Sequence, residues 1–192
     1  MATLGAETGR VLPEGRELRV RSARPRDARA LFQLLESVAG ETEPTLLIRP
    51  GESTAKLWRR RISAAGLDYR SLFLLGVLDG EVVGNLGLER DPHANSSHVA
   101  WVGMSVGREW RGLGVGSTLL GTAIEWAAGN GGEKLALSVF PENARAIVFY
   151  ERHGFAREGL RKAQFQRNGR YHDEVLMARF LTPLAEGAGH AS

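Results

Sequence analysis

The sequence contains no cysteine, which excludes disulfide frameworks, cysteine-bound zinc or iron–sulfur centres, and a thiol nucleophile. It also lacks a long apolar run: the longest, residues 72–78, is far shorter than the ~18 residues that a membrane span needs. The N-terminus has neither the basic region nor the apolar region of an export signal. Without cysteine, the chemistry must come from oxygen or nitrogen groups or from a cofactor. Without a membrane span or an export signal, we expect a cytoplasmic protein with no membrane partner.

Positive charge is not concentrated in this chain. Lysine is scarce, with three residues against 22 arginines, and the net charge is only +3. The dense basic run, Arg59, Arg60 and Arg61, falls on an expected helix, where a solvated face is the ordinary explanation, so we expect no nucleic-acid partner. The five histidines show no HExxH-type spacing, and we therefore expect no metal site.

The length and composition fit one globular domain, because 192 residues with 43% hydrophobic and 24% charged residues can bury a single core. We expect flexible tails at 1–15 and 184–192 around a domain at 16–183, because both ends lack a hydrophobic period. The spacing of apolar residues and the turn signals Asp79-Gly80 and Asn168-Gly169 predict a mixed α+β layer. The expected strands cover 18–22, 72–78, 81–88, 98–106, 134–139 and a terminal pair. The expected helices follow Pro25, cover 52–65, run from Val115 to Gly129, and cover 143–153.

The most informative segment is the run RGLGVGS at residues 111–117, which follows a predicted strand and opens an amphipathic helix. Its glycines allow a ligand close to the backbone, and the free N–H groups of a helix N-terminus attract an anion. A phosphate or pyrophosphate is the natural occupant, to which Ser117 would add a hydroxyl. A Walker loop and a dinucleotide-binding fingerprint both fail to fit, and a tight turn without ligand is the alternative.

Two spaced motifs resemble the central motifs of the GCN5-related N-acetyltransferase (GNAT) superfamily. The first reads V-x4-R-x2-G-x-G at 106–116, and the second reads N-x2-A-x3-Y-x3-G-F at 143–155. The resemblance covers about residues 18–180, and the runs 98–106 and 169–178 look most like bacterial small-molecule, amino-acid or protein N-terminal acetyltransferases. It implies a single α+β domain whose mixed, mostly antiparallel central sheet splays between its fourth and fifth strands and is flanked by helices.

This resemblance implies acetyl-CoA as co-substrate, with the pyrophosphate on the first motif and the pantetheine arm along the strand before it. It also implies that Asn143 contacts CoA and that Tyr150 stands beside the thiol as the acid for the leaving thiolate. The alternatives are a helix N-cap for Asn143 and a core aromatic for Tyr150. The implied binding residues are Met104, Val106, Arg111, Gly112, Leu113, Gly114, Val115, Gly116, Ser117, Asn143, Ala146 and Tyr150.

The general base is missing from its usual place. Many members of the superfamily carry a glutamate on the fourth strand, but the corresponding stretch here contains Trp101 and no carboxylate. The nearest titratable candidates are Glu89 at the end of the third strand and His98 at the start of the fourth. For both residues, a solvated strand end is the alternative interpretation.

Together these features predict an N-acetyltransferase that moves acetyl from acetyl-CoA to a primary amine by direct attack, with no acyl-enzyme and no metal. The expected acceptor is a free amino acid, a small amine or a peptide N-terminus. Glu41, Thr42 and Glu43 fall where the substrate loop is expected, and a solvated loop is the alternative interpretation. The acids Glu41, Glu43 and Glu52 are too few for a polycation. The alternative is a non-catalytic acyl-CoA-binding module, and a homodimer is compatible with either.

Overall fold

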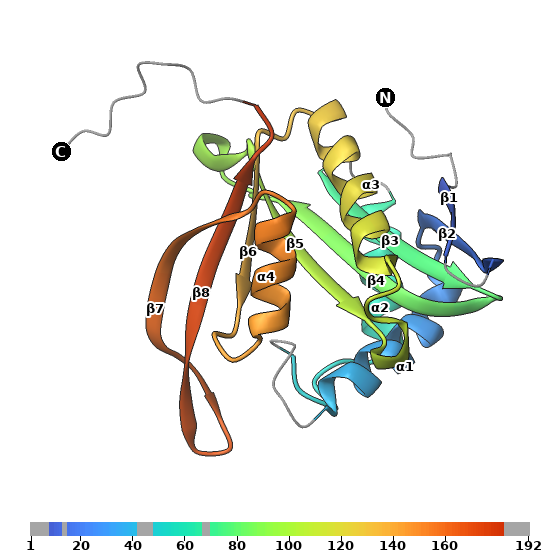
Figure 1. Ribbon diagram of the computed structural model, residues 1–192, viewed down its shortest axis with the longest axis horizontal. Coiled ribbons are helices and arrows are strands. Elements are labelled where there is room, and N and C mark those ends of the chain that lie inside the picture. Colours follow the sequence, from blue (N-terminus) through green and yellow to red (C-terminus); the bar gives the residue numbers. More distant parts are fainter. Residues whose placement is uncertain (1–7, 13–14, 42–47, 67–69, 183–192) are drawn as a thin grey trace.

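The computed structural model describes residues 8–12, 15–41, 48–66 and 70–182. Within them, eight strands form one sheet in the order β1-β2-β3-β4-β5-β6-β8-β7. All pairs are antiparallel except β5 with β6 (Figure 1). The strands are β1 Thr8–Val11, β2 Glu17–Ser22, β3 Ser71–Leu78, β4 Glu81–Arg90, β5 Val99–Val106, β6 Lys134–Val139, β7 Ala156–Arg167 and β8 Arg170–Phe180. The helices are α1 Ala28–Ala39, α2 Ala55–Ala65, α3 Val115–Gly129 and α4 Ala144–Arg152. This architecture confirms the predicted α+β class.

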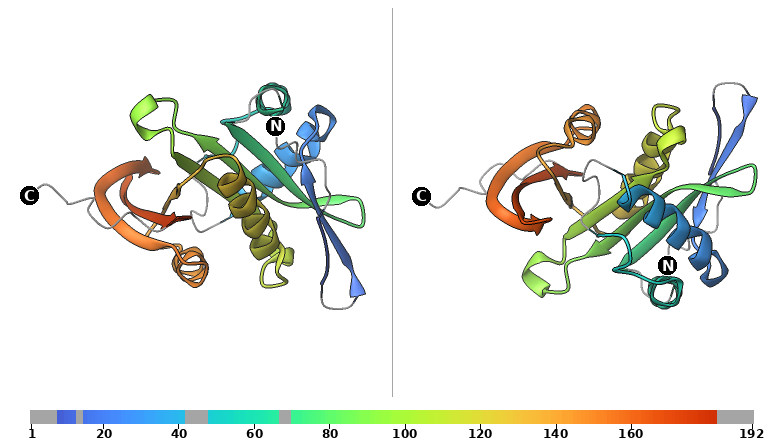
Figure 2. Two further views of the ribbon diagram at one scale, coloured as in Figure 1. Left: turned by 90° about the horizontal axis from the view of Figure 1, so that it is seen from above. Right: turned by 90° about the horizontal axis from the view of Figure 1, so that it is seen from below.

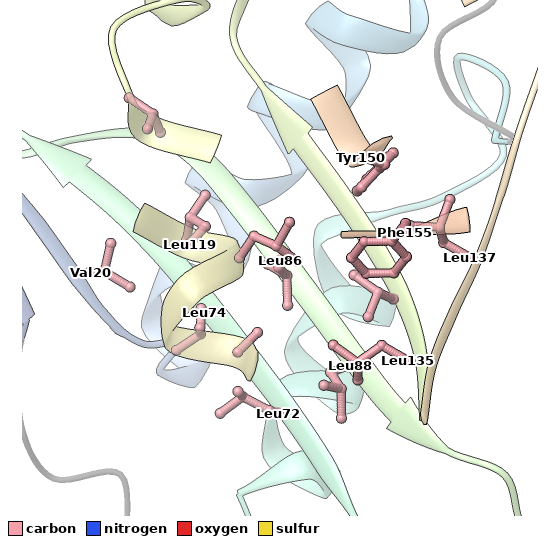
Figure 3. Packing of buried hydrophobic residues seen from close by; sticks show 14 of the residues in the cluster. Val20, Leu72, Leu74, Leu86, Leu88, Leu119, Leu135, Leu137, Tyr150 and Phe155 are labelled. Carbon is pink, nitrogen blue, oxygen red and sulfur yellow. The ribbon is translucent and has the colours of Figure 1, made fainter. Parts of the chain in front are cut away.

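The four helices cover the two faces of the sheet in pairs. Helices α3 and α4 lie on one face, and α1 and α2 lie on the other (Figure 2). Leu119 of α3 packs over Leu74 and Leu86 of the central strands in the larger core cluster (Figure 3). The smaller cluster joins Leu31 of α1 to Ile62 of α2. Each helix therefore buries one apolar stripe, as its sequence period predicts.

The sheet divides between β5 and β6. The two parallel strands pair over only three positions, Val99 with Lys134, Ala100 with Leu135 and Trp101 with Ala136. Beyond these pairs the strands diverge, and α4 lies beside the gap (Figure 1). The expected splay is confirmed, and it leaves the β6-facing side of the second half of β5 without a neighbouring strand.

Close packing brings the start of α3 onto the sheet. A Cβ at Gly84 of β4 would lie 3.0 Å from Cγ1 of Val115 and 3.2 Å from the Ser105 carbonyl oxygen, so a larger residue would push the helix away. Val115 itself is 1% exposed. Because Gly84 has no side chain, the start of α3 can lie close to β4, and this contact fixes the position of the N–H groups of the glycine run.

Two predictions of element bounds are wrong. The expected tail at 1–15 contains β1, whose residues pair with β2 from Thr8 opposite Val20 to Val11 opposite Glu17. All four residues of β1 are exposed, so this strand carries no apolar alternation that a sequence pattern could reveal. The helix expected from residue 52 begins instead at Ala55, because the Thr54 hydroxyl caps it by accepting a hydrogen bond from the Leu57 N–H.

No helix in the described part of the chain is long and apolar enough to cross a membrane.

Candidate active site

A first cleft opens where β5 and β6 separate. It is lined by residues from the end of β5, the glycine run and the first two turns of α4. Ten of the predicted binding residues line it: Met104, Val106, Arg111, Gly112, Gly114, Gly116, Ser117, Asn143, Ala146 and Tyr150. Val38, Ser105, Trp110, Arg145 and Phe149 also line it and were not anticipated. The two sequence motifs, separated by more than 25 residues in the chain, thus form the walls of one cleft.

The glycine run has the backbone that the sequence predicts for an anion cradle. Gly112 has φ +83° and Gly114, the N-cap of α3, has φ +96°, a left-handed conformation that residues with a Cβ rarely adopt. The N-terminus of the 15-residue helix α3 therefore opens toward the cleft with its uncapped N–H groups and the positive end of its dipole.

Arg111 has a different role from the one that its position in the motif suggests. Its Nε donates to the Val106 carbonyl oxygen at 2.9 Å, and its two terminal nitrogens donate to the Glu41 carboxylate at 2.8 and 2.5 Å. The guanidinium thus ties the cradle to β5 and to the end of α1. Glu41, which was considered as a partner for the substrate amine, is neutralised by this pair. Thr42 and Glu43 lie outside the described residues.

Two arginines outside the glycine run flank it. Nη2 of Arg145, on α4, lies 3.7 Å from where a Cβ would stand on Gly112. The guanidinium carbon of Arg10, on β1, lies 3.4 Å from the corresponding point on Gly114, and its Nη1 donates to the Thr118 hydroxyl at 3.4 Å. Neither forms an ion pair within the described residues. Sequence reasoning missed both because they are distant in the chain from the glycines.

Leu113, Val115 and Ser117 of the run make contacts within the protein. The side chains of Leu113 and Val115 pack into the core and do not line the cleft. The Ser117 hydroxyl lies 3.1 Å from Nε2 of His153, whose Nδ1 lies 2.7 Å from the Phe149 carbonyl oxygen. That contact joins α3 to α4 across the cleft wall.

The second motif supplies a cap and a buried phenol. The Asn143 side chain caps α4 by accepting from the Ala146 N–H at 3.2 Å. Tyr150 is 7% exposed and makes edge contacts with Phe149 and Phe155, at ring-centroid distances of 5.2 and 5.4 Å (Figure 3). Burial raises the pKa of the Tyr150 phenol above its usual value, so the group holds its proton. Asn143 is therefore a helix cap and Tyr150 is a core aromatic, as the alternative interpretations held, and both residues also line the cleft.

A second cleft lies on the other side of the same wall, toward α1 and α2. Its floor comes from β4 and β5 and includes the buried Asn85 and the exposed Glu89. Glu89 is opposite Trp101 in the strand pairing, beside the stretch in which the expected carboxylate is missing. His98 is exposed and lines neither cleft. Of the two candidate bases, Glu89 therefore lines the same cleft as Tyr150, and His98 lies outside it.

Comparison with known proteins identifies the family. The model of the acetyltransferase (GNAT) family matches residues 30–155, more than half of the chain. The chain belongs to the GNAT family. It is 32% identical over 168 residues to the L-amino acid N-acetyltransferase AaaT of Escherichia coli (strain K12), an alignment that covers 85% of this chain and 98% of AaaT. This GNAT chain is therefore an acyl-CoA-dependent N-acetyltransferase.

Solved structures share the GNAT fold. A GNAT-family acetyltransferase from Streptococcus pneumoniae aligns with a TM-score of 0.78 at 28% identity, covering 85% of this chain and 99% of that one. YncA from Salmonella typhimurium, a putative acetyltransferase described with its cofactor acetyl-CoA, gives a TM-score of 0.79 at 18% identity over 88% of this chain and 96% of that one. Within its described residues, this GNAT domain has no group of three or more metal-ligating side chains.

Proposed function

We propose that this enzyme acetylates the primary amine of an amino acid, a small amine or a peptide N-terminus by direct transfer from acetyl-CoA. One observation carries the proposal: the two clefts share part of their lining. A thioester in the first cleft and an amine in the second would meet at this common wall. The shared residues are Met104, Ser105, Asn143, Ala146 and Tyr150.

The first cleft fits the anionic end of acetyl-CoA. Gly114 leaves open the space that a Cβ would fill, and Arg10 and Arg145 bring two positive charges without carboxylate partners in the described structure. A pyrophosphate at the start of α3 would be held by backbone N–H groups and these two guanidinium groups. Arg111 would act indirectly, by fixing the loop through Val106 and Glu41.

Transfer then needs one proton acceptor and one proton donor. The amine nitrogen bonds to the thioester carbonyl carbon, the carbon–sulfur bond breaks, and an amide and the CoA thiol result. Glu89 takes the proton that the nitrogen must lose, through water, and Tyr150 gives its proton to the sulfur. Both groups then recover their starting protonation states by exchange with solvent.

A panel of acceptors tests the proposal. Purified protein is mixed with acetyl-CoA and, separately, with L-amino acids, small monoamines, spermidine and short peptides with free N-termini, while thiol release and product mass are followed. The proposal predicts thiol release matched by an acetylated amine for at least one α-amine. Tight CoA binding with no turnover of any amine would support the non-catalytic module instead. Spermidine preferred over every α-amine would overturn the acceptor assignment.

Removing the positive charge beside the glycine run should weaken acetyl-CoA binding. We expect Arg145→Gln to raise the KM for acetyl-CoA about 10-fold or more, since a charge-assisted hydrogen bond to phosphate contributes about 1.5–3 kcal/mol. Arg10→Gln should act in the same direction. The matched control is Arg152→Gln, at an exposed position of the same helix as Arg145 that lines neither cleft. Equal KM values for Arg145→Gln, Arg10→Gln and the control would show that the two arginines do not contact the phosphates.

The raised pKa of Tyr150 sets the alkaline side of the pH profile. A free phenol loses its proton near pH ~10. Burial raises the pKa of Tyr150 above that value, so the donor stays protonated at lower pH. We therefore expect no fall of kcat between about pH 8 and 9.5, because the proton donor keeps its proton throughout this range. A fall of kcat in this range that is absent in Tyr150→Phe would contradict the account.

A further inference from the structure

The floor of the second cleft is built from paired residues of β4 and β5. Residues opposite each other in an antiparallel pair project on the same face of the sheet, so each pair forms one step of the floor. A Cβ on Gly103 would meet nothing within 4 Å, whereas one on Gly87 would lie 3.2 Å from the Phe73 ring, so the middle step is open at Gly103 and bordered by Phe73 at Gly87. The steps are Asn85 with Ser105, Gly87 with Gly103, and Glu89 with Trp101. The floor is therefore open at Gly103 and carries polar groups at both ends.

Asn85 carries a hydrogen-bond acceptor that no group in the described part of the chain satisfies. Its side-chain Oδ1 is buried and has no partner, and the residue is 5% exposed and lines the cleft. It is the one such buried side-chain atom in the described part of the chain. An unpaired buried acceptor costs stability, and such atoms are rare in folded proteins. A donor that arrives with a ligand would satisfy it.

A positive charge stands on another wall of the same cleft. Arg61 of α2 lines it, and its guanidinium carbon lies 5.3 Å from the centre of the Trp58 ring. Trp58 is buried and is held in turn by its Nε1, which donates to the Ser53 hydroxyl at 3.1 Å. Arg61 has no ion pair within the described residues. A cation is thus positioned by stacking while its hydrogen-bond donors remain available.

The charges of the cleft complement a zwitterion. Among the described residues that line it, Arg61 is the one cation and Glu89 is the one anion, and the unpaired acceptor of Asn85 lies at the end of the floor opposite to Glu89. An α-amino acid presents a carboxylate and an ammonium group on one carbon atom. A polyamine would meet a single carboxylate and a repelling guanidinium. The remaining wall includes Leu35, Ile48 and Phe73, which suit an apolar side chain.

We propose that the second cleft selects a free α-amino acid with an apolar side chain, whose carboxylate binds Arg61 and whose amine donates to Asn85 Oδ1. This inference rests on the proposed function and narrows its acceptor to carboxylate-bearing amines. Arg61 is then the residue that determines specificity, and Asn85 aims the amine nitrogen toward the wall that the two clefts share.

A matched series of acceptors tests the role of Arg61. L-leucine, L-leucinamide and 3-methylbutylamine share one side chain, and only the first has a carboxylate. We expect kcat/KM for leucine to exceed that for leucinamide by about 10-fold or more, although leucinamide has the larger fraction of free amine. Arg61→Gln should abolish this preference and change leucinamide less than threefold. Arg60→Gln, an exposed neighbour that does not line the cleft, should retain it.

Binding measured without turnover separates this inference from the proposed function. Leucine and leucinamide are titrated calorimetrically into protein saturated with CoA, which cannot donate acetyl. The inference predicts tighter binding of leucine, lost in Arg61→Gln. Equal binding of the two ligands would overturn it, whether or not the enzyme turns over. Acetylation of 3-methylbutylamine as efficiently as leucine would also overturn it while leaving the N-acetyltransferase function intact.

Asn85→Leu tests the role of the unpaired acceptor. A purely structural role would not combine an unchanged or higher Tm with a lower kcat/KM for leucine. The change replaces an unsatisfied buried atom by an apolar group of similar size, so we expect the Tm to stay the same or to rise. The kcat/KM for leucine should nevertheless fall about 10- to 100-fold, because a hydrogen bond to a charged amine is lost, while the KM for acetyl-CoA stays unchanged. Unchanged kcat/KM for leucine in a folded variant would overturn the contact.

Discussion

Tyr150→Phe should lower kcat about 10²- to 10⁴-fold, the range expected for loss of one general acid. The substitution keeps the ring, its burial and its edge contacts with Phe149 and Phe155, and removes only the hydroxyl. Binding of acetyl-CoA should change little, and the loss of stability should not exceed that of one hydrogen bond, about 1 kcal/mol. Steady-state kcat, acetyl-CoA affinity and Tm on the one variant check all three expectations.

The chain offers a matched control for the phenol. Tyr171 of β8 is 70% exposed and lines neither cleft, so Tyr171→Phe removes a hydroxyl of the same chemistry far from the reaction. It should leave kcat at the wild-type value. A stable Tyr150→Phe enzyme with near-normal kcat would show that Tyr150 is not the general acid. Direct proton transfer from the amine to the thiolate, or a water, would then explain departure of the thiol.

Gly114→Val should raise the KM for acetyl-CoA by about 10- to 100-fold. At φ +96° a residue with a Cβ is strained by about 1–2 kcal/mol, and that Cβ would lie 3.4 Å from the guanidinium carbon of Arg10. Either the loop changes conformation or the new side chain occupies the space beside the helix N-terminus, and in both cases the cradle is lost. Titration of acetyl-CoA into the folded variant gives the same answer without turnover.

Gly121→Val provides the comparison for that substitution. Gly121 lies in the same helix, has no positive φ, and a Cβ there would meet nothing within 4 Å. The KM for acetyl-CoA should therefore match the wild type. A normal KM for Gly114→Val, with the protein folded, would mean that the phosphates do not bind at this loop.

The local features of this fold could be predicted from the sequence, because they depend on neighbouring residues. Asp79-Gly80 and Asn168-Gly169 give the two hairpins, and both pairs have the positive φ values that such turns require. The resemblance of the two motifs to the GNAT superfamily implied that Asn143 and Tyr150 share a cleft with the glycine run, and both residues line that cleft. Strand β1, held by backbone pairing with exposed side chains, gave no pattern to detect.

The remaining parts of the site depend on contacts between distant segments. The bond between Arg111 and Glu41 spans 70 positions, and the approach of Arg10 to Thr118 spans 108. The pairing of Glu89 with Trp101 depends on the register of β4 and β5, which decides which side chains share a face. Asn85 appeared in the sequence as one polar residue in a strand, and only the packing around it shows that its acceptor is unpaired.

The central claim is that acetyl passes directly between two substrates held in adjoining clefts. Initial rates of thiol release, measured while acetyl-CoA and L-leucine are both varied, test it most directly. The account predicts intersecting double-reciprocal lines, because both substrates must be bound before either product leaves. Parallel lines, together with stoichiometric acetylation of the protein by acetyl-CoA alone, would contradict it.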